Sequence, residues 1–469
     1  MSTSEVVAGT RALAARASDG LSATRTAPTP SWGPPFFGQV FGAWRDPIGT
    51  MMSGMLDHGD VMFFRFGPFK YFVLSDPAAI KHVLTDNAKN YVKSRNYQGL
   101  RILFGQGLLT SEGDFWKRQR RLAQPAFHRE RLAGLARSMA SETRRMLDRW
   151  RAEGTERACA HAEMMRLTFA IVGRTLFSTD VDGDSSAIGE ALTVGLHWTN
   201  DYAESLVRIP PWVPTPANLE FRRAQKTLDD LVYRIIAERK RSGELGDDLL
   251  GMLMAATDET GNERMDDKQL RDEVLTLVLA GHETTANLLA FTFHMLSLHP
   301  EWDRRVAEEA RAVLGDREPT FEDMPKLKIA RLVLEETMRL YPPVWTFERQ
   351  ALADDVVLGY ALPKDAIVGI SPYALHRNPK LWDNPEGFDP ERFLPERSEG
   401  RSKYAYLPFG GGPRTCIGNN FAMTEALIIL SMVAREHRLT RAPGHRLVLD
   451  PAVTLRPKEG IAVTIGPRA

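Results

Sequence analysis

A long apolar segment near the middle of the chain constrains the fold more than any other feature. Residues 274–280 and 286–291 are mostly hydrophobic and show no separate polar face. A helix that is hydrophobic all round lies buried in a protein. Over 267–298 such a helix would be ~45 Å long at about 1.5 Å per residue, the width of a whole domain. The sequence therefore predicts one long helix through the core.

Polar residues interrupt this apolar segment at Gly281-His-Glu-Thr-Thr285. A glycine within a helix costs roughly 1 kcal/mol relative to alanine, and buried polar groups need partners. Such a cluster suits a place where the helix passes dioxygen and a chain of water, which makes Glu283 and Thr284 candidate proton-relay groups. A helix kink, in which the threonines bond back to the preceding turn, explains the segment equally well.

The remaining patterns predict a mainly α fold with a small β-rich lobe. Helical periodicity dominates 116–311, apart from a proline-rich break at 209–216. Residues 61–75 resemble a β-hairpin that turns at Gly67-Pro68. Further β signals cover 346–372 and recur near 447–465. With no internal repeat, we expect an extended or disordered tail over residues 1–30 and a single domain over 31–469.

Composition narrows the possible functions. The 60 basic and 60 acidic residues cancel, so nothing points to nucleic acid or an anionic membrane. No segment reaches the ~20 uninterrupted apolar residues of a membrane span, and residues 1–27 hold no signal-peptide core. A targeting peptide and a disordered tail both remain open for that start. The two cysteines, Cys159 and Cys416, favour a reducing cytoplasm, and no ligand cluster for zinc is present in the sequence.

One cysteine stands in an unusual setting, the segment Phe409-Gly-Gly-Gly-Pro-Arg-Thr-Cys416-Ile-Gly418. Glycines and a proline form an irregular turn that lets the backbone approach a flat cofactor. Backbone N–H groups and the start of a predicted helix over 419–435 would stabilise a thiolate there. Arg414 would lie beside the cofactor and bind an acidic group of it. An isolated cysteine is more often a small buried hydrophobe, but these neighbours favour a metal-binding thiolate.

A glutamate and an arginine three residues apart, Glu336 and Arg339, share one helix face. Apolar neighbours on both sides suggest that this pair is buried, so it needs further partners, and Arg392 is a candidate. The same spacing elsewhere suggests solvated surface pairs, at Glu142/Arg145, Glu220/Arg223, Glu238/Arg241 and Glu308/Arg311.

Taken together and in this order, the motifs resemble those of the cytochrome P450 family of haem-thiolate enzymes. The cysteine segment matches FxxGxRxCxG, 280–285 matches the oxygen-activating helix, and Glu336 and Arg339 match the ExxR pair. Pro390-Glu-Arg-Phe393 and the WxxxR segment beginning at Trp116 match two further motifs. The resemblance extends from about Trp32 to the C-terminus, and implies a helical triangular prism around a buried haem.

The resemblance also implies a role for each matched residue. Cys416 would be the axial ligand of the iron of haem b. Thr284 would hold the oxygen being activated and its water, while Glu283 helps to deliver protons. The positions that would hold the haem are Trp116, Arg120, Arg349, Phe409, Arg414, Cys416 and Gly418. Those that would fix the haem-binding core are Glu336, Arg339 and Arg392.

The resemblance places an apolar substrate pocket over the haem, lined in part by 93–108, and 209–216 resembles its entrance lid. The lining positions are Trp198, Leu279, Ala280, Val344, Thr346, Phe347 and Thr454. Such a pocket suits a fatty acid, terpenoid, steroid or polyketide-like small molecule. For each of these positions, ordinary core packing is the alternative.

The expected reaction is a monooxygenation that uses O2 and electrons from NAD(P)H. Because the chain ends about fifty residues after Cys416, we expect separate redox partners, a ferredoxin and its reductase, and a monomeric cytoplasmic protein. Lys117, Arg118 and Arg121 would form a basic docking surface for an acidic ferredoxin, or simply a solvated helix face.

A haem-thiolate isomerase would not need Glu283 and Thr284, whereas a peroxygenase, a cysteine-nucleophile enzyme and a haem sensor remain alternatives.

Overall fold

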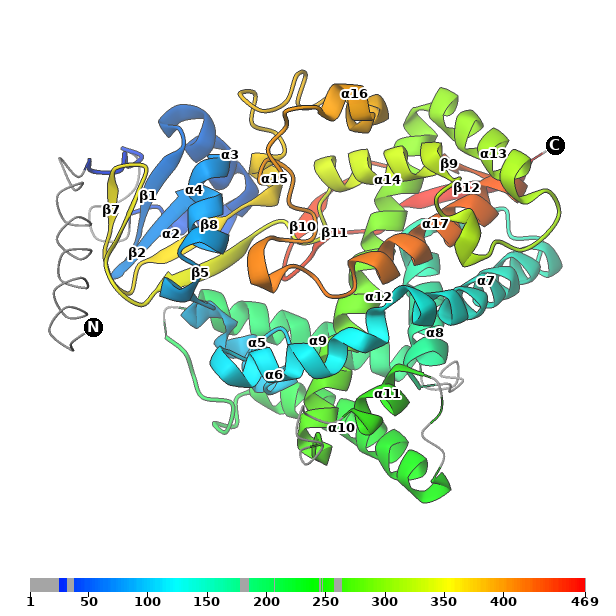
Figure 1. Ribbon diagram of the computed structural model, residues 1–469, viewed down its shortest axis with the longest axis horizontal. Helices are drawn as coiled ribbons and strands as arrows, with labels where there is room; N and C mark the ends of the chain where they lie inside the picture. Colours follow the sequence, from blue (N-terminus) through cyan, green and yellow to red (C-terminus); the bar gives the residue numbers. More distant parts are fainter. Residues whose placement is uncertain are drawn as a thin grey trace, which may run out of the picture.

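A computed structural model gives the arrangement of most of the chain, and its outline is roughly triangular (Figure 1). A β-rich lobe occupies one corner, α10 the lowest corner, and α13 with β9 and β12 the remaining one. Residues 1–24 of the tail predicted over 1–30 lie outside the described residues, as does Trp32, where the family resemblance begins. The described residues are 25–31, 38–177, 185–205, 207–243, 246, 248–256 and 264–468.

The β-rich lobe contains a five-stranded sheet with the order β1-β2-β8-β5-β3. Its first two strands form the predicted antiparallel hairpin, and Phe66 pairs with Phe69 across a turn in which Gly67 has φ +60°. Strand β8 pairs in parallel with β2 and antiparallel with β5. The strands are β1 (Val61–Phe66), β2 (Phe69–Leu74), β3 (Tyr91–Val92), β5 (Phe347–Ala351) and β8 (Ile367–Ile370), beside the hairpin of β6 (Asp355–Val357) and β7 (Tyr360–Leu362).

Helices form most of the rest of the molecule. The larger ones are α3 (Pro47–His58), α6 (Gly113–Ala123), α7 (Arg129–Ala152), α8 (Ala160–Phe177), α9 (Ser185–Glu204), α10 (Pro216–Ser242), α12 (Asp267–Leu298), α13 (Pro300–Leu314), α14 (Lys328–Leu340) and α17 (Asn419–Glu436). The shorter ones are α2 (Val40–Arg45), α4 (Pro77–Lys81), α5 (Gln98–Phe104), α11 (Leu249–Ala255), α15 (Pro372–Leu375) and α16 (Pro395–Ser398). The predicted break at 209–216 separates α9 from α10, where Thr215 caps the new helix and Pro216 begins it.

The central helix α12 has the predicted bounds and runs through the middle of the molecule (Figure 1). Asp266 and Gln269 form a capping box at its start. Among the described residues it is the one helix long and apolar enough to cross a membrane, but 78% of its apolar window is buried inside the protein. One hydrophobic cluster joins α12 to α7, α14 and α17, and a second joins it to α9, α10 and α11. Helix α12 is therefore the core around which the other helices pack.

Two small sheets lie at the C-terminal end of the chain. The pair of β10 (Leu449–Pro451) and β11 (Leu455–Pro457) forms a tight hairpin. Strand β12 (Ala462–Pro467) pairs with β4 (Arg157–Cys159) on one side and β9 (His437–Arg441) on the other. The sequence patterns missed β4 and β9, because both are short and gain their hydrogen bonds from a strand distant in sequence.

Candidate active site

The loop that carries Cys416 is folded back on itself before α17. The Cys416 backbone N–H donates to the Phe409 carbonyl at 2.9 Å, which closes the loop. Gly412 has φ +69°, and a Cβ placed there would lie 1.9 Å from the Leu84 carbonyl oxygen. No other residue type fits at this position, because the backbone conformation and the close neighbour both exclude a side chain.

The Cys416 sulfur lies where two groups favour its charged form. The backbone N–H of Gly418 donates to it, and the Arg120 guanidinium attracts it. Burial raises the pKa of the thiol, while both of those groups lower it. Helix α17 begins three residues later, at Asn419, so its positive end also faces this region. Protein surrounds the thiol, yet its side chain keeps accessible surface, as does Ala280 within the otherwise buried α12.

Three cations gather around one shared carboxylate on the Arg414 side of the loop. Arg414 pairs with Glu112 and stacks over the Trp116 ring at 4.0 Å. Burial, opposed by Glu112 and reinforced by the Arg349 charge, lowers the pKa of Arg414 to about 10. Burial and the charges of Arg349 and Arg414 hold the pKa of Lys93 well below its usual value. One carboxylate cannot neutralise three cations, so this cluster is suited to bind a further anion.

A terminal nitrogen of Arg414, Nη1, is buried and has no hydrogen-bond partner in the part of the chain that the structure describes. An unpartnered buried donor is costly, so an acceptor from a bound group would stabilise it. Of the residues predicted to hold the haem, Arg349 and Arg414 lie in this cluster and Trp116 supports it. The Arg120 charge instead influences Cys416. Sequence reasoning assigned no role in anion binding to Lys93, because a single lysine in a loop carries no motif.

Glu283 and Thr284 are adjacent on α12 but have different partners. The Thr284 hydroxyl donates to the Ala280 carbonyl at 2.5 Å, which is the back-bonded arrangement of the alternative interpretation. The buried Glu283 accepts a 2.6 Å hydrogen bond from Thr454 at Oε1. Its Oε2 is buried with no partner among the described residues. Burial raises the pKa of Glu283, and Thr454, Arg456 and His197 oppose that shift.

The neighbouring His282 points elsewhere. Its Nε2 contacts the Met165 carbonyl at 3.1 Å, and burial lowers its pKa to about 4, so the ring is neutral at physiological pH. Of the polar run that interrupts α12, Glu283 and Thr284 therefore remain the candidates for proton transfer.

The predicted pocket residues fall into two groups. Val344 is 36% exposed and Ala280 also keeps accessible surface. The others are largely packed against protein. Trp198 stacks on Phe221 with a ring separation of 3.9 Å and donates to Asn218, so it packs α9 against α10. The remaining members of this group are Leu279, Phe347 and Thr454, which are buried, and Thr346, whose hydroxyl contacts the Ile370 carbonyl at 3.4 Å.

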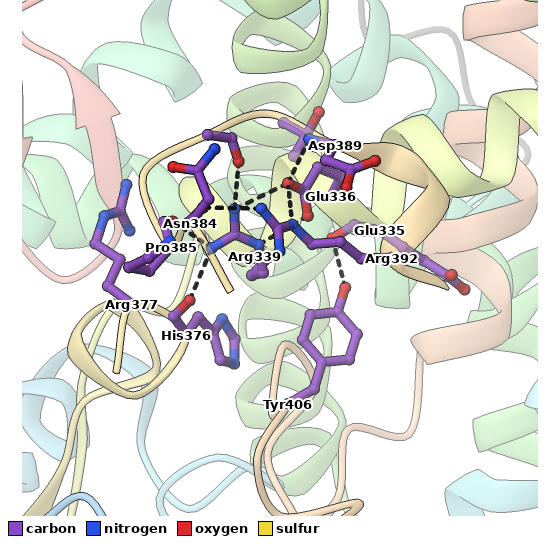
Figure 2. A network of polar contacts seen from close by, with 12 residues as sticks. Glu335, Glu336, Arg339, His376, Arg377, Asn384, Pro385, Asp389, Arg392 and Tyr406 are labelled. Atoms are coloured by element: carbon purple, nitrogen blue, oxygen red, sulfur yellow. Dashed lines mark hydrogen bonds and ion pairs between the residues drawn. The ribbon is translucent and has the colours of Figure 1, made fainter. Parts of the chain in front are cut away.

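The pair of Glu336 and Arg339 is fully buried and lies at the centre of a network (Figure 2). Arg339 binds both Glu336 oxygens, at 2.7 and 2.8 Å, and the spacing predicted this pairing. Arg392 approaches Glu336 at 3.3 Å, and the Asp389 N–H donates to it at 2.8 Å. Arg339 also donates to the carbonyls of His376, Pro385 and Gly387. These bonds tie α14 to the segment that precedes the cysteine loop.

Among the other pairs with the same spacing, the one at Glu142 differs from expectation. Glu142 is buried rather than solvated, because it joins Arg145 on its own helix to Arg174 on α8. The residue spacing within one helix cannot predict an ion pair that this helix forms with another helix. Glu308 forms an ion pair with Arg304 at 3.5 Å, on an exposed face.

Comparisons with known proteins agree with this geometry. A family model described as Cytochrome P450 matches residues 28–463. The chain is 36% identical over 419 residues to cyclooctat-9-en-7-ol 5-monooxygenase of Streptomyces melanosporofaciens, with 88% of this chain and 89% of that protein covered. It is 35% identical over 413 residues to pentalenene oxygenase of Streptomyces avermitilis, with 87% and 90% covered. A crystal structure of the cytochrome P450DA haem domain superposes with a TM-score of 0.86 at 27% identity, covering 95% of this chain and 98% of that one.

Proposed function

This chain belongs to the cytochrome P450 family, and from that premise we propose that it is a monooxygenase whose substrate is an apolar molecule of the terpenoid class. In the net reaction one oxygen atom enters a C–H bond of the substrate and the other leaves as water, with consumption of two electrons and two protons. The observation that supports the chemistry is the Cys416 thiol beside the Gly418 N–H and Arg120.

The residues present fit haem b. Haem, when bound, supplies a thiolate-ligated iron centre that activates O2. In the proposal, the Cys416 sulfur would bind the iron, and the Gly418 N–H and Arg120 oppose the rise in its pKa that burial causes. Lys93, Arg349 and Arg414 would hold the carboxylates of the porphyrin, which would give the unpartnered Nη1 of Arg414 an acceptor. Phe409 packs at the start of the same loop.

Two residues of α12 would manage protons and water on the substrate side. The Thr284 hydroxyl hydrogen is committed to the Ala280 carbonyl, so its oxygen is oriented to accept a hydrogen bond. Glu283 has one oxygen held by Thr454 and one without a partner, which is the oxygen available to exchange a proton. The raised pKa of Glu283 lies closer to neutral pH, and general acid–base groups work best when their pKa is near the working pH.

The substrate class rests on the relatives and on the character of the lining. The two Streptomyces relatives are named for a cyclooctatenol and for pentalenene. Val344 and Ala280, the proposed lining residues with accessible surface, carry no polar side-chain atoms. Burial of a hydrocarbon against an apolar wall is favourable, and such a wall offers few hydrogen-bond partners for polar groups.

Electrons must come from redox partners, and we infer a ferredoxin with its reductase that draws on NAD(P)H. Of the proposed docking residues, Lys117 already pairs with Asp114 at 2.8 Å and Arg118 contacts Gln269 at 3.5 Å. A groove of about 720 Å³ beside the cysteine loop, lined in part by Phe409, Arg129 and Arg331, is a second surface for the donor. The cytoplasmic location proposed for this system rests on the presence of only two cysteines.

A substrate screen followed by turnover tests the proposal. A terpene that enters the pocket should displace water from the haem iron and shift the visible spectrum, and turnover with ferredoxin, reductase and NAD(P)H should yield a hydroxylated product. Val344→Phe should weaken terpene binding several-fold by filling the pocket, whereas Val448→Phe, at a position 46% exposed, should not. Shifts with fatty acids alone would overturn the substrate class, and a rearranged product without consumption of O2 would overturn the monooxygenase.

A further inference from the structure

The carboxyl group of Glu283 is held from one side by a segment that belongs to neither α12 nor the cysteine loop. Thr454 lies in the turn between β10 and β11, and its hydroxyl donates to Glu283 Oε1 at 2.6 Å. Both side chains are buried, with 5% of each exposed. A short hydrogen bond between buried groups strongly favours one orientation of the carboxyl group, because water cannot replace the hydroxyl as its donor.

The turn that presents Thr454 is itself anchored on both sides of that residue. The Leu455 N–H donates to the Pro343 carbonyl, and the Trp345 indole N–H donates to the Ala452 carbonyl, both at 2.8 Å. Leu455 is fully buried in the core. The turn that carries Thr454 is therefore anchored to the segment after α14 by bonds that involve neither Glu283 nor the haem-binding residues.

A second residue of α12 determines the direction of the Thr454 bond. Asn287, one turn after Glu283, donates from Nδ2 to the Thr454 hydroxyl oxygen at 3.2 Å. The amide oxygen of Asn287 contacts His161 Nε2 at 2.9 Å, which makes that ring nitrogen the donor. Because the Thr454 oxygen already accepts from Asn287, its hydrogen is directed to Glu283. The donors therefore all point along one path, from His161 through Asn287 and Thr454 to Glu283.

We infer that Thr454 is a positioning residue for proton delivery: it holds Oε1 of Glu283 so that Oε2 is the oxygen that takes up and releases protons. This inference rests on the proposed monooxygenase function and assigns Thr454 a task other than lining the substrate pocket. Asn287 cannot pass protons readily, because an amide would have to change tautomer, so its task is to orient Thr454. Protons reach Oε2 by another path.

Charged groups from three other elements surround this carboxyl. Arg456 on β11 and His197 on α9 favour its ionised form, and Asp450 on β10 opposes it. Arg456 bridges the other two, with 2.8 Å to Asp450 and 2.7 Å to His197. His197 is exposed, so the cluster extends from Glu283 to the surface of the protein. Loss of the Thr454 bond would leave the carboxyl to reorient toward Arg456.

The test uses Thr454→Val, which keeps the shape and removes the hydroxyl, with Thr454→Ser as the matched control that keeps it. In the haem-loaded enzyme, Thr454→Val should lower the fraction of electrons that appear in product several-fold and divert them to peroxide, and Thr454→Ser should restore it. The infrared band of the protonated Glu283 carboxyl, assigned with Glu283→Gln, should persist to higher pH in Thr454→Val. This shift is expected because the removed bond favours the ionised form.

The same pair of variants separates the possible failures. Normal coupling in Thr454→Val together with strong uncoupling in Glu283→Gln would overturn the positioning role and leave the proposed relay intact. Normal coupling in both variants would overturn the relay itself, and the inference with it. A loss of thermal stability in Thr454→Val with an unchanged carboxyl band and unchanged coupling would show that the bond is only structural, which also overturns the inference.

Discussion

At the scale of single residues, the two cysteines of this chain have different surroundings. Cys159 lies on β4, paired with Ala462, and a Cβ added to Gly460 would lie 2.4 Å from its sulfur. The Cys416 sulfur instead accepts a hydrogen bond from the Gly418 backbone N–H and is attracted by the positive charge of Arg120. A thiol becomes a ligand when such groups stabilise its anion, so these neighbours, not the residue type, distinguish the two cysteines.

Replacing each cysteine in turn tests this distinction. Cys416→Ala should abolish the strongly red-shifted absorption band of the reduced carbon monoxide complex, because only a thiolate ligand produces it. Cys159→Ala should keep the band at full intensity per haem, since Cys159 only packs within the sheet that contains β4. Survival of the band in Cys416→Ala would contradict the proposed ligand.

At the scale of elements, different parts of α12 have different roles. Near its start, the Asp272 carboxylate accepts from the Gln106 N–H at 2.8 Å and a carboxyl oxygen of Glu273 accepts from the Leu108 N–H at 3.0 Å. Gly107 fits tightly against it, because a Cβ there would lie 2.1 Å from the Thr276 hydroxyl. The helix therefore holds the loop over 105–108, part of the proposed pocket wall, about three turns before Glu283.

The pH dependence of stability should report on this attachment. Burial, opposed by the Leu108 N–H and reinforced by Asp272, raises the pKa of Glu273 to about 8. The folded protein thus keeps this proton up to about pH 8, whereas the unfolded chain releases it near pH 4.5. Stability should fall as pH rises through that window, by at most roughly 1.4 kcal/mol per pH unit.

Glu273→Gln removes the titration, so its unfolding free energy should fall less between pH 5 and pH 8 than that of the natural protein. Denaturant unfolding at several pH values measures the difference, and Glu308→Gln on an exposed face is the control. Parallel curves for Glu273→Gln and the natural protein would show that the carboxyl does not titrate in this range.

At the scale of the whole molecule, the network around Glu336 joins helices to the segment before the cysteine loop (Figure 2). Neither Glu336 nor Arg339 has measurable exposure, and Glu336 accepts bonds from Arg339, Arg392 and the Asp389 backbone. Removal of one charge from such a buried pair costs about 3–5 kcal/mol, because the other stays buried without its partner.

Glu336→Gln should therefore yield little folded, haem-loaded protein. Circular dichroism and haem content per chain measure the loss, and Glu308→Gln, which breaks an exposed pair with Arg304, should change neither. Normal haem content in Glu336→Gln would show that the network does not support the cysteine loop.

Sequence alone determined the features that depend on local order. The bounds of α12 followed from a long apolar segment, the β1/β2 hairpin from its turn at Gly67-Pro68, and the cysteine loop from its glycines. The Glu336–Arg339 pair followed from the spacing of one helix turn. In each case the residues that interact are close in sequence, so periodicity or spacing reveals them.

Only the tertiary structure decided the partners that meet across distant segments. It added Lys93 to the Arg349 and Arg414 cluster, and it placed Thr454 against Glu283, 171 residues earlier in the chain. It also showed that Trp198 packs between α9 and α10. Such contacts depend on how helices and hairpins pack, and packing is set by the summed burial of many side chains that no local pattern records.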